Sequence, residues 1–137
     1  MTVCTTGERK QMPATILVVD DHEAVRHSLR DWLEVEFPRC RVICACSAED
    51  ALALSCKLLP EVVVMDLTLP GMGGIEATRR LRALLPSVQV VVLTIFDSET
   101  HRSDAGAAGA GAYVTKQAMR TQLIPTLTAM LAKSSPV

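Results

Sequence analysis

Four short apolar runs are separated along the chain by longer segments of mixed polarity. They are Ile16–Val19, Val62–Met65, Val90–Leu93 and Ala112–Val114. Short, nearly continuous runs that are rich in β-branched residues are typical of strands buried on both faces of a parallel sheet. A further strand is predicted over Arg41–Cys46. The pattern therefore predicts five strands whose faces are both covered by helices.

The segments between the strands show helical periodicity. After the first strand, apolar residues at helical spacing predict a helix that ends before Pro38: Val25, Leu29, Trp32 and Leu33. Ser47, with the acidic Asp50 three residues later, predicts an N-cap, and the helix it opens should run to about Leu59. A third helix stops before Pro86 and is expected to turn five residues inward: Ile75, Thr78, Leu81, Leu84 and Leu85.

The last part of the chain continues the alternation. The fourth strand is predicted over Val88–Leu93, and the segment Ser98–Gly111 that follows it is rich in alanine and glycine. A helix in that segment buries little and is held weakly. The closing helix has Pro125 near its first turns and is outlined by Met119, Leu123, Leu127, Met130 and Leu131.

Five alternating strand and helix units define the expected topology. Right-handed crossovers between parallel strands place helices on both faces of one sheet. We expect a flavodoxin-like three-layer α/β sandwich with five helices and strand order 2-1-3-4-5. In this order the first and third strands are neighbours, so Asp20 and Asp21 should lie beside Asp66.

Polar residues stand directly after, or close to, the ends of the predicted strands. Asp20 and Asp21 follow the first strand, Asp66 the third, and Thr94 and Lys116 the fourth and fifth. Polar groups at the carboxyl ends of parallel strands converge on one edge of the sheet. The sequence therefore predicts an acidic pocket with one hydroxyl and one ammonium, suited to a divalent cation and a phosphoryl group. His22 opens a helix and is expected to face solvent.

Length and composition limit the classes of protein. The 137 residues suffice for one domain, and 49% hydrophobic with 21% charged residues is typical of a compact protein. A net charge of −1 does not indicate the strongly basic surface that is typical of nucleic-acid-binding domains. No apolar stretch is long enough to cross a membrane, and the polar segment Met1–Ala14 is no signal peptide. We expect a cytoplasmic protein with a flexible tail at 1–14, a domain at 15–132 and a C-terminal tail at 133–137.

The five cysteines carry no predicted function. They are odd in number and lack the usual spacing of a thiolate metal site: Cys4, Cys40, Cys44, Cys46 and Cys56. We interpret them as small hydrophobic residues in a reducing compartment.

Four motifs carry a family resemblance. They are ILVVDDH at 16–22, VMDLTLPGMGG at 64–74, VVLT at 91–94 and GAYVTK at 111–116. In order and spacing they resemble the receiver domain of two-component response regulators. The loops are most similar to the subfamily whose receivers precede a helix-turn-helix DNA-binding domain.

The resemblance implies roles for the residues at the strand ends. Asp66 would be the phosphoacceptor and, with Mg²⁺, would form an acyl phosphate. Asp21 would ligate Mg²⁺ directly and Asp20 chiefly through water, with Asp66 and the backbone carbonyl of Thr68 as further ligands. Lys116 would neutralise charge on the transferring group.

The resemblance also implies a switch and a set of partners. Thr94 would move toward the phosphoryl group, and Tyr113 would swing into the vacated space. The donor would be a sensor histidine kinase or a phosphotransfer protein, and a phosphorylation-dependent homodimer is expected. The chain would turn over no separate substrate and would not itself bind nucleic acid.

Three other functions compete with this interpretation. A haloacid dehalogenase-type phosphatase needs a second Asp two residues after the nucleophile, where this chain has Thr68. A flavodoxin-type FMN protein needs a hydroxyl- and glycine-rich loop after the first strand, where Asp20 and Asp21 would repel phosphate. A pseudo-receiver that binds partners without phosphorylation is the alternative, although every reactive position is filled. The chain is either a stand-alone receiver or the regulatory domain of a longer regulator.

Overall fold

The apolar runs form the strands of one parallel sheet in the computed structural model, which describes residues 14–134. The strands are β1 (Thr15–Val19), β2 (Arg41–Ala45), β3 (Val62–Met65), β4 (Gln89–Thr94) and β5 (Ala112–Thr115). All four neighbouring pairs are parallel, and the order across the sheet is β2-β1-β3-β4-β5. The predicted strand order is confirmed, with β2 ending one residue earlier than expected and β4 shifted by one.

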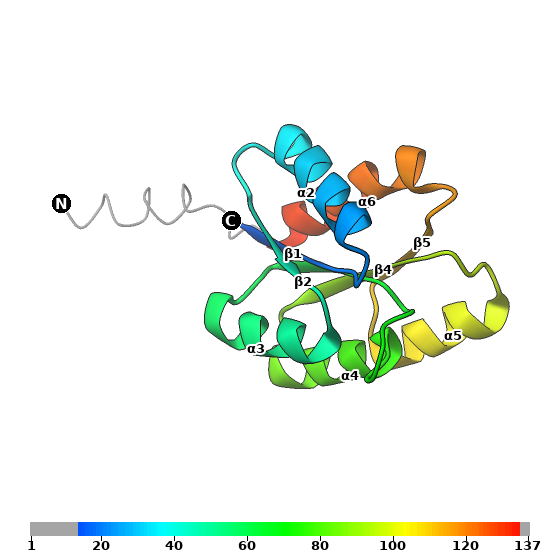
Figure 1. Ribbon diagram of the computed structural model, residues 1–137. Helices are drawn as coiled ribbons and strands as arrows, with labels where there is room; N and C mark the ends of the chain where they lie inside the picture. The colour runs from blue at the N-terminus through cyan, green and yellow to red at the C-terminus, as the bar shows by residue number, and fades with distance from the viewer. Residues whose placement is uncertain (1–13, 135–137) are drawn as a thin grey trace.

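Five helices cover the sheet. They are α2 (Glu23–Glu36), α3 (Ala48–Leu58), α4 (Gly74–Leu84), α5 (Glu99–Ala108) and α6 (Met119–Ser134). Helices α2 and α6 lie on one face, and α3, α4 and α5 lie on the other (Figure 1). The predicted flavodoxin-like three-layer sandwich is confirmed. None of the described helices is long and apolar enough to cross a membrane.

The two predicted tails fall largely outside the described part of the chain. Of residues 1–14 only Ala14 is described, and of residues 133–137 only Lys133 and Ser134.

The core lies on both sides of the sheet because successive strand residues point in opposite directions. Ile16 and Val18 of β1 pack in the layer under α2 and α6, together with Leu29, Leu33, Leu123 and Leu127. Leu17 and Val19 pack in the opposite layer, together with Ala77 and Leu81. Each of the Val, Leu and Ile side chains contributes about 1.5–3 kcal/mol when fully buried. The strand ends are therefore held from both sides.

Leu84 corrects one sequence prediction. It was expected to face inward, yet it is 55% exposed. The buried face of α4 is formed by Gly74, Ala77, Thr78 and Leu81. The helix ends at Leu84, and Leu85 in the C-cap position packs against the core instead. The chain leaves the helix at Leu85 and turns over Pro86 and Ser87, so Leu85 rather than Leu84 reaches the core.

Gly74 allows α4 to begin directly against the end of β3. Its N–H donates to the carbonyl of Leu67 at 3.2 Å. A Cβ atom at this position would lie 2.2 Å from the carbonyl oxygen of Asp66 and 2.8 Å from the Cα of Leu67. Backbone atoms cannot move aside as a side chain can, so only glycine fits. The start of α4 therefore fixes the position of the backbone that carries Asp66.

We expect Gly74→Ala to lower the free energy of unfolding by about 1–3 kcal/mol, because the added methyl group forces the backbone apart. Gly106→Ala is the matched control, since a Cβ at Gly106 in α5 would meet no atom within 4 Å. It should raise stability by about 0.5–1 kcal/mol through helix propensity. Urea unfolding followed by circular dichroism measures both. Equal effects of the two substitutions would contradict this account of Gly74.

Candidate functional site

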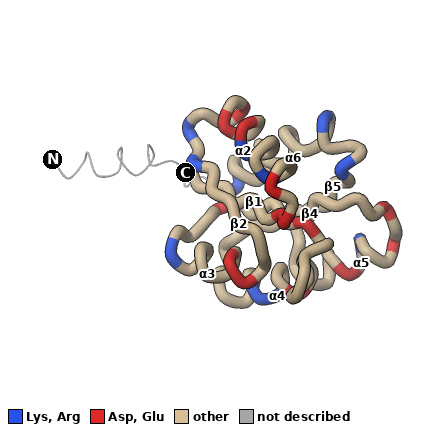
Figure 2. The backbone as a smooth tube through the Cα atoms, in the orientation of Figure 1, with Lys and Arg blue, Asp and Glu red and all other residues tan. Residues whose placement is uncertain are grey.

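The carboxyl ends of β1 and β3 bring three carboxylates together. Val19 pairs with Met65 across the two strands, so Asp20 and Asp66 follow neighbouring strand ends. Asp20 is 1% exposed and Asp66 4%. Single ligand atoms of four residues lie within 4.8 Å of one another: Asp20, Asp21, His22 and Asp66. Figure 2 shows acidic segments gathered where the strands end. The structure thus brings the acidic residues predicted from the sequence to one place.

Lys116 supplies the positive charge of this site. Its backbone N–H donates to the carbonyl of Thr94 at 2.7 Å, which extends the pairing of β5 with β4 by one residue. Its Nζ donates to Oδ2 of Asp20 at 3.1 Å and lies 3.8 Å from Oδ2 of Asp66. The ammonium therefore contacts two carboxylates that come from different strands.

Backbone donors orient both buried carboxylates. Oδ1 of Asp66 accepts from the N–H of Thr68 at 3.1 Å, and Oδ1 of Asp20 accepts from the N–H of His22 at 2.9 Å. Arg26 donates to the backbone carbonyl of Asp20 at 2.8 Å. An Asp side chain that bonds the backbone two residues later forms a local turn. These bonds leave Oδ2 of each carboxylate directed at Lys116.

The protonation of Asp66 is set by opposing influences. Burial raises the pKa of Asp66 above its ordinary value, and this is the largest effect. The Thr68 hydrogen bond and the Lys116 ammonium act to lower that pKa, whereas the nearby Asp20 and Asp21 act to raise it. When all its carboxylates are ionised, the site therefore carries more negative than positive charge.

The donor set fits a small divalent cation. Three carboxylates face one ammonium, so the fully ionised site carries a formal charge of −2. Like charges about 4 Å apart near a protein surface repel by about 4 kcal/mol. Carboxylate oxygens are the ligands that Mg²⁺ prefers, and Mg²⁺ keeps several waters of its own. The residues present therefore fit this ion.

His22 contacts the acidic cluster although it faces solvent as expected. Its side chain is 69% exposed, with Nδ1 3.3 Å from Oδ1 of Asp21 and 3.5 Å from Oδ1 of Asp20. It occupies the N-cap position of α2 without a side-chain capping bond. These contacts of His22 were not predicted from the sequence. The only signal for them is that His22 directly follows Asp20 and Asp21.

Thr94 and Tyr113 meet at a residue that the sequence did not single out. The buried hydroxyl of Thr94 accepts from the N–H of Phe96 at 3.2 Å. The hydroxyl of Tyr113 donates to the carbonyl of Phe96 at 2.7 Å. The ring of Phe96 stacks on His101 with centroids 4.5 Å apart, and the guanidinium of Arg102 lies 4.6 Å from the centre of the Tyr113 ring. Phe96 therefore links the two residues of the expected switch.

We expect Asp66→Asn to raise the urea midpoint at neutral pH in the presence of a chelator. Because burial raises the folded-state pKa, the ionised carboxyl destabilises the fold above that pKa. The penalty shrinks as the pH falls toward the ordinary value of 3.8, so the advantage of Asn should shrink with it. Asp104→Asn on the exposed side of α5 is the control and should change little at either pH. An advantage of Asn that grows on acidification would contradict the assigned direction.

Sequence relatives of the chain are response regulators. Residues 16–128 match the response regulator receiver domain family. The response regulator GacA of Pseudomonas aeruginosa is 36% identical over 118 residues, which are 85% of this chain and 55% of that protein. The response regulator MprA of a Mycobacterium species is 38% identical over 125 residues, which are 91% of this chain and 54% of that protein. The chain spans about half the length of the curated relatives it matches.

Solved structures agree with this relationship. A two-component response regulator of the LuxR family from Aurantimonas has a TM-score of 0.82 at 38% identity, covering 88% of this chain and 86% of that chain. A CheY-like receiver domain protein from Methanospirillum hungatei has a TM-score of 0.82 at 27% identity, covering 89% and 96%. The BeF3-activated DrrB receiver domain has a TM-score of 0.79 at 28% identity, covering 88% and 99%. The sheet order, the acidic edge and these matches show that the chain belongs to the receiver domain family of two-component response regulators.

Proposed function

We propose that this receiver domain, placed at residues 15–132, accepts a phosphoryl group on Asp66 and uses it to switch an output surface. The donor is a sensor histidine kinase or a phosphotransfer protein. The observation that carries the proposal is the position of the Lys116 ammonium between the buried carboxylates of Asp20 and Asp66. A lysine held beside an acidic cluster is suited to stabilise the charge of a transferring phosphoryl group.

Mg²⁺ would be held by Asp20, Asp21 and Asp66, together with the backbone carbonyl of Thr68. When bound, it would neutralise negative charge on the phosphoryl oxygens. Asp21 is the most accessible of the three carboxylates, with 31% of its side chain exposed, which suits a direct ligand.

Asp66 is the nucleophile in this proposal. One of its oxygens forms a bond to phosphorus while the phosphorus–nitrogen bond of a phosphohistidine donor breaks, and the histidine nitrogen keeps the bonding electrons. The Thr68 N–H bonded to Oδ1 keeps the carboxylate oriented during attack. The Lys116 ammonium favours the ionised form of Asp66 that the attack requires.

The switch is proposed to run through Phe96. Movement of the Thr94 hydroxyl toward a phosphoryl group would carry it away from the N–H of Phe96, which donates to it at 3.2 Å. Movement of Thr94 therefore releases Phe96, whose carbonyl holds the hydroxyl of Tyr113. Phosphorylation biases this two-state element and so alters the surface around α5, β5 and α6.

The chain acts as a phospho-switch and turns over no separate substrate. We propose a cytoplasmic location, no membrane association and no direct contact of this domain with nucleic acid. A homodimer that forms on phosphorylation is one route by which the altered surface acts. The LuxR-family neighbour makes transcription regulation the proposed output of a protein that contains this domain.

The test is intact mass after incubation with acetyl phosphate and Mg²⁺. We expect one added phosphoryl group on the wild-type chain, since Asp66 is the only proposed acceptor. Asp66→Asn and a chelated sample should show none, and Asp104→Asn should label as the wild type does. Circular dichroism would verify that every variant is folded.

Two results would overturn the proposal. One is label on Asp66→Asn, which would place the acceptor elsewhere. The other is the absence of label on the folded wild-type chain with both acetyl phosphate and an active histidine kinase, which would leave a pseudo-receiver that binds partners without phosphorylation.

Mg²⁺ is expected to stabilise the chain by binding the folded state alone. At a hundredfold excess over its dissociation constant the gain should be about 2.7 kcal/mol. Asp21→Asn should reduce the gain, whereas Asp31→Asn, an exposed carboxyl on α2, should not. Thermal unfolding with increasing MgCl2, at constant ionic strength, measures this. Equal stabilisation of all three proteins would show that the ion acts elsewhere.

A further inference from the structure

The side chain of Arg26 binds the backbone of the acidic edge from α2. Its Nη1 donates to the carbonyl oxygen of Asp20 at 2.8 Å, and its own backbone N–H donates to the carbonyl of His22 at 2.9 Å. Arg26 is thus bound to both ends of the three-residue segment that joins β1 to α2. No step of the proposed phosphoryl transfer uses this contact.

The bond from Arg26 completes a set of four hydrogen bonds that hold Asp20. The N–H of Asp20 donates to the carbonyl of Ala45 in β2 at 3.2 Å. Its two carboxylate oxygens accept from the N–H of His22 and from the ammonium of Lys116. Hydrogen bonds with a charged donor are roughly twice as strong as those between neutral groups. Every polar group of Asp20 therefore has a partner, and the carbonyl depends on Arg26.

Asp21 has less support of its own. Its side chain is 31% exposed, and among the described residues the one ion-pair partner of its carboxylate is the exposed imidazole of His22, at 3.3 Å. The carbonyl of Asp20 and the N–H of Asp21 belong to one planar peptide unit. A guanidinium that holds this carbonyl therefore restricts the backbone from which the Asp21 carboxylate extends.

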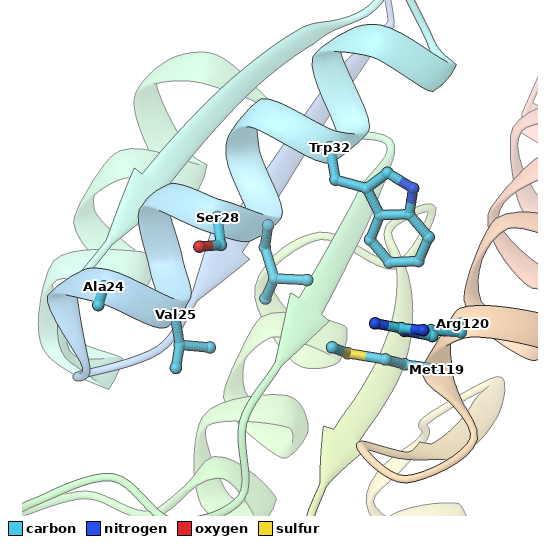
Figure 3. A pocket seen from close by; sticks show the side chains of 7 residues that line it. Ala24, Val25, Ser28, Trp32, Met119 and Arg120 are labelled. Carbon is cyan, nitrogen blue, oxygen red and sulfur yellow. The ribbon is translucent and has the colours of Figure 1, made fainter.

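Arg26 is on a different side of α2 from the apolar groove beside α6. The groove is lined by Val25, Ser28 and Trp32 of α2 and by Met119 and Arg120 of α6 (Figure 3). Arg26 and Arg30 are absent from that lining. Burial raises the pKa of the Cys44 thiol in β2, and the charges of Arg30 and Arg26 act to lower it. Both guanidinium groups therefore lie on the side of α2 that faces β2.

We propose that Arg26 is a positioning residue for the divalent cation, because it holds the peptide between Asp20 and Asp21 and so preorganises the Asp21 carboxylate as a ligand. The inference rests on the proposed function only for the identity of the ion, Mg²⁺. Without the Arg26 bond the ion would have to order this segment as it binds, and that cost would appear as weaker binding. Removal of a residue that orients a metal ligand typically costs about 10–100-fold in metal affinity.

The sign of the effect distinguishes positioning from electrostatics. Arg26 is positively charged and the fully ionised site is negative, so loss of the charge alone would strengthen the binding of a cation. Loss of a positioning bond would weaken it. Burial has the largest effect on the pKa of Asp66, and the charges that act on it belong to Lys116, Asp20 and Asp21. Arg26 is not among them, so we expect its positioning effect to outweigh the effect of its charge.

The test is a titration of the isotope-labelled chain with MgCl2 at constant ionic strength, without a phosphoryl donor. The backbone N–H of Thr68 donates to Oδ1 of Asp66, so its resonance in a nitrogen–proton correlation spectrum should respond to the ion. Arg26→Met keeps the length of the side chain without its donors, and we expect it to bind Mg²⁺ about tenfold more weakly than the wild type. Arg26→Lys keeps a charged donor and should remain within about threefold of the wild type.

Arg30→Met is the matched control. Arg30 lies on the same side of α2, and its guanidinium pairs with the exposed Asp31 at 3.3 Å. The substitution takes the same charge from the same helix without breaking a bond to the acidic edge, so the Mg²⁺ affinity should stay within about twofold of the wild type. The resonance of the folded chain is followed, so a change in global stability does not itself alter the measured affinity. Should Arg26→Met fail to fold, the shorter and uncharged side chain of Arg26→Gln replaces it in the test.

Several outcomes would refute the role of Arg26. Binding of Mg²⁺ by Arg26→Met that is as tight as in the wild type, or tighter, would leave only an effect of charge. Equal weakening in Arg30→Met would show that the effect does not belong to the Asp20 carbonyl, and equal weakening in Arg26→Lys would assign it to side-chain shape.

The same titration separates this inference from the proposed function. A wild-type chain whose Thr68 resonance shows no saturable shift would overturn both the role of Arg26 and the proposed magnesium site. A wild-type chain that binds Mg²⁺ but takes no phosphoryl group would overturn the phosphoryl transfer alone, because the Arg26 variants are compared without a donor.

Discussion

The concentration of like charge at the carboxyl edge of a buried sheet is the constraint on which this structure depends. Three carboxylates meet there because their strands are neighbours, and one ammonium from β5 contacts two of them. Two close attractions do not offset the repulsion among three carboxylates at similar distances. The apolar layers on both faces of the sheet fix the strands whose ends carry these charges. The negative charge that remains after pairing with Lys116 makes a divalent cation the natural complement of the site.

The positions of these charges are set by contacts that themselves carry no charge. α4 begins at Gly74 against the backbone of Asp66, where no side chain would fit. The N–H groups of Thr68 and His22 orient the two buried carboxylates. Backbone geometry therefore decides which carboxylate oxygens are directed at Lys116, and a change of packing at α4 would act on the site without removing any ionisable group.

The two helical layers of the sandwich differ in how they are held. α3, α4 and α5 pack side by side, whereas α2 and α6 leave an apolar groove between them. Both helices of the open layer continue directly from loops of the acidic edge. At the same carboxyl edge of the sheet, Phe96 follows β4 and joins the hydroxyls of Thr94 and Tyr113 through its own backbone. The acidic site is thus flanked by the groove between α2 and α6 and by the hydrogen bonds of Phe96.

Local patterns in the sequence were sufficient to predict the elements, their order and the edge at which Asp20, Asp66 and Lys116 meet. Buried strands have a clear apolar signature, and parallel connectivity leaves few topologies. The exposure of Leu84, the role of Phe96 and the groove at Trp32 and Arg120 were decided by tertiary structure alone. The exposure of Leu84 depends on where the chain leaves α4. The role of Phe96 depends on its backbone N–H and carbonyl, which every residue except proline has. The groove depends on the spacing of α2 and α6. No side-chain pattern along the chain records such features.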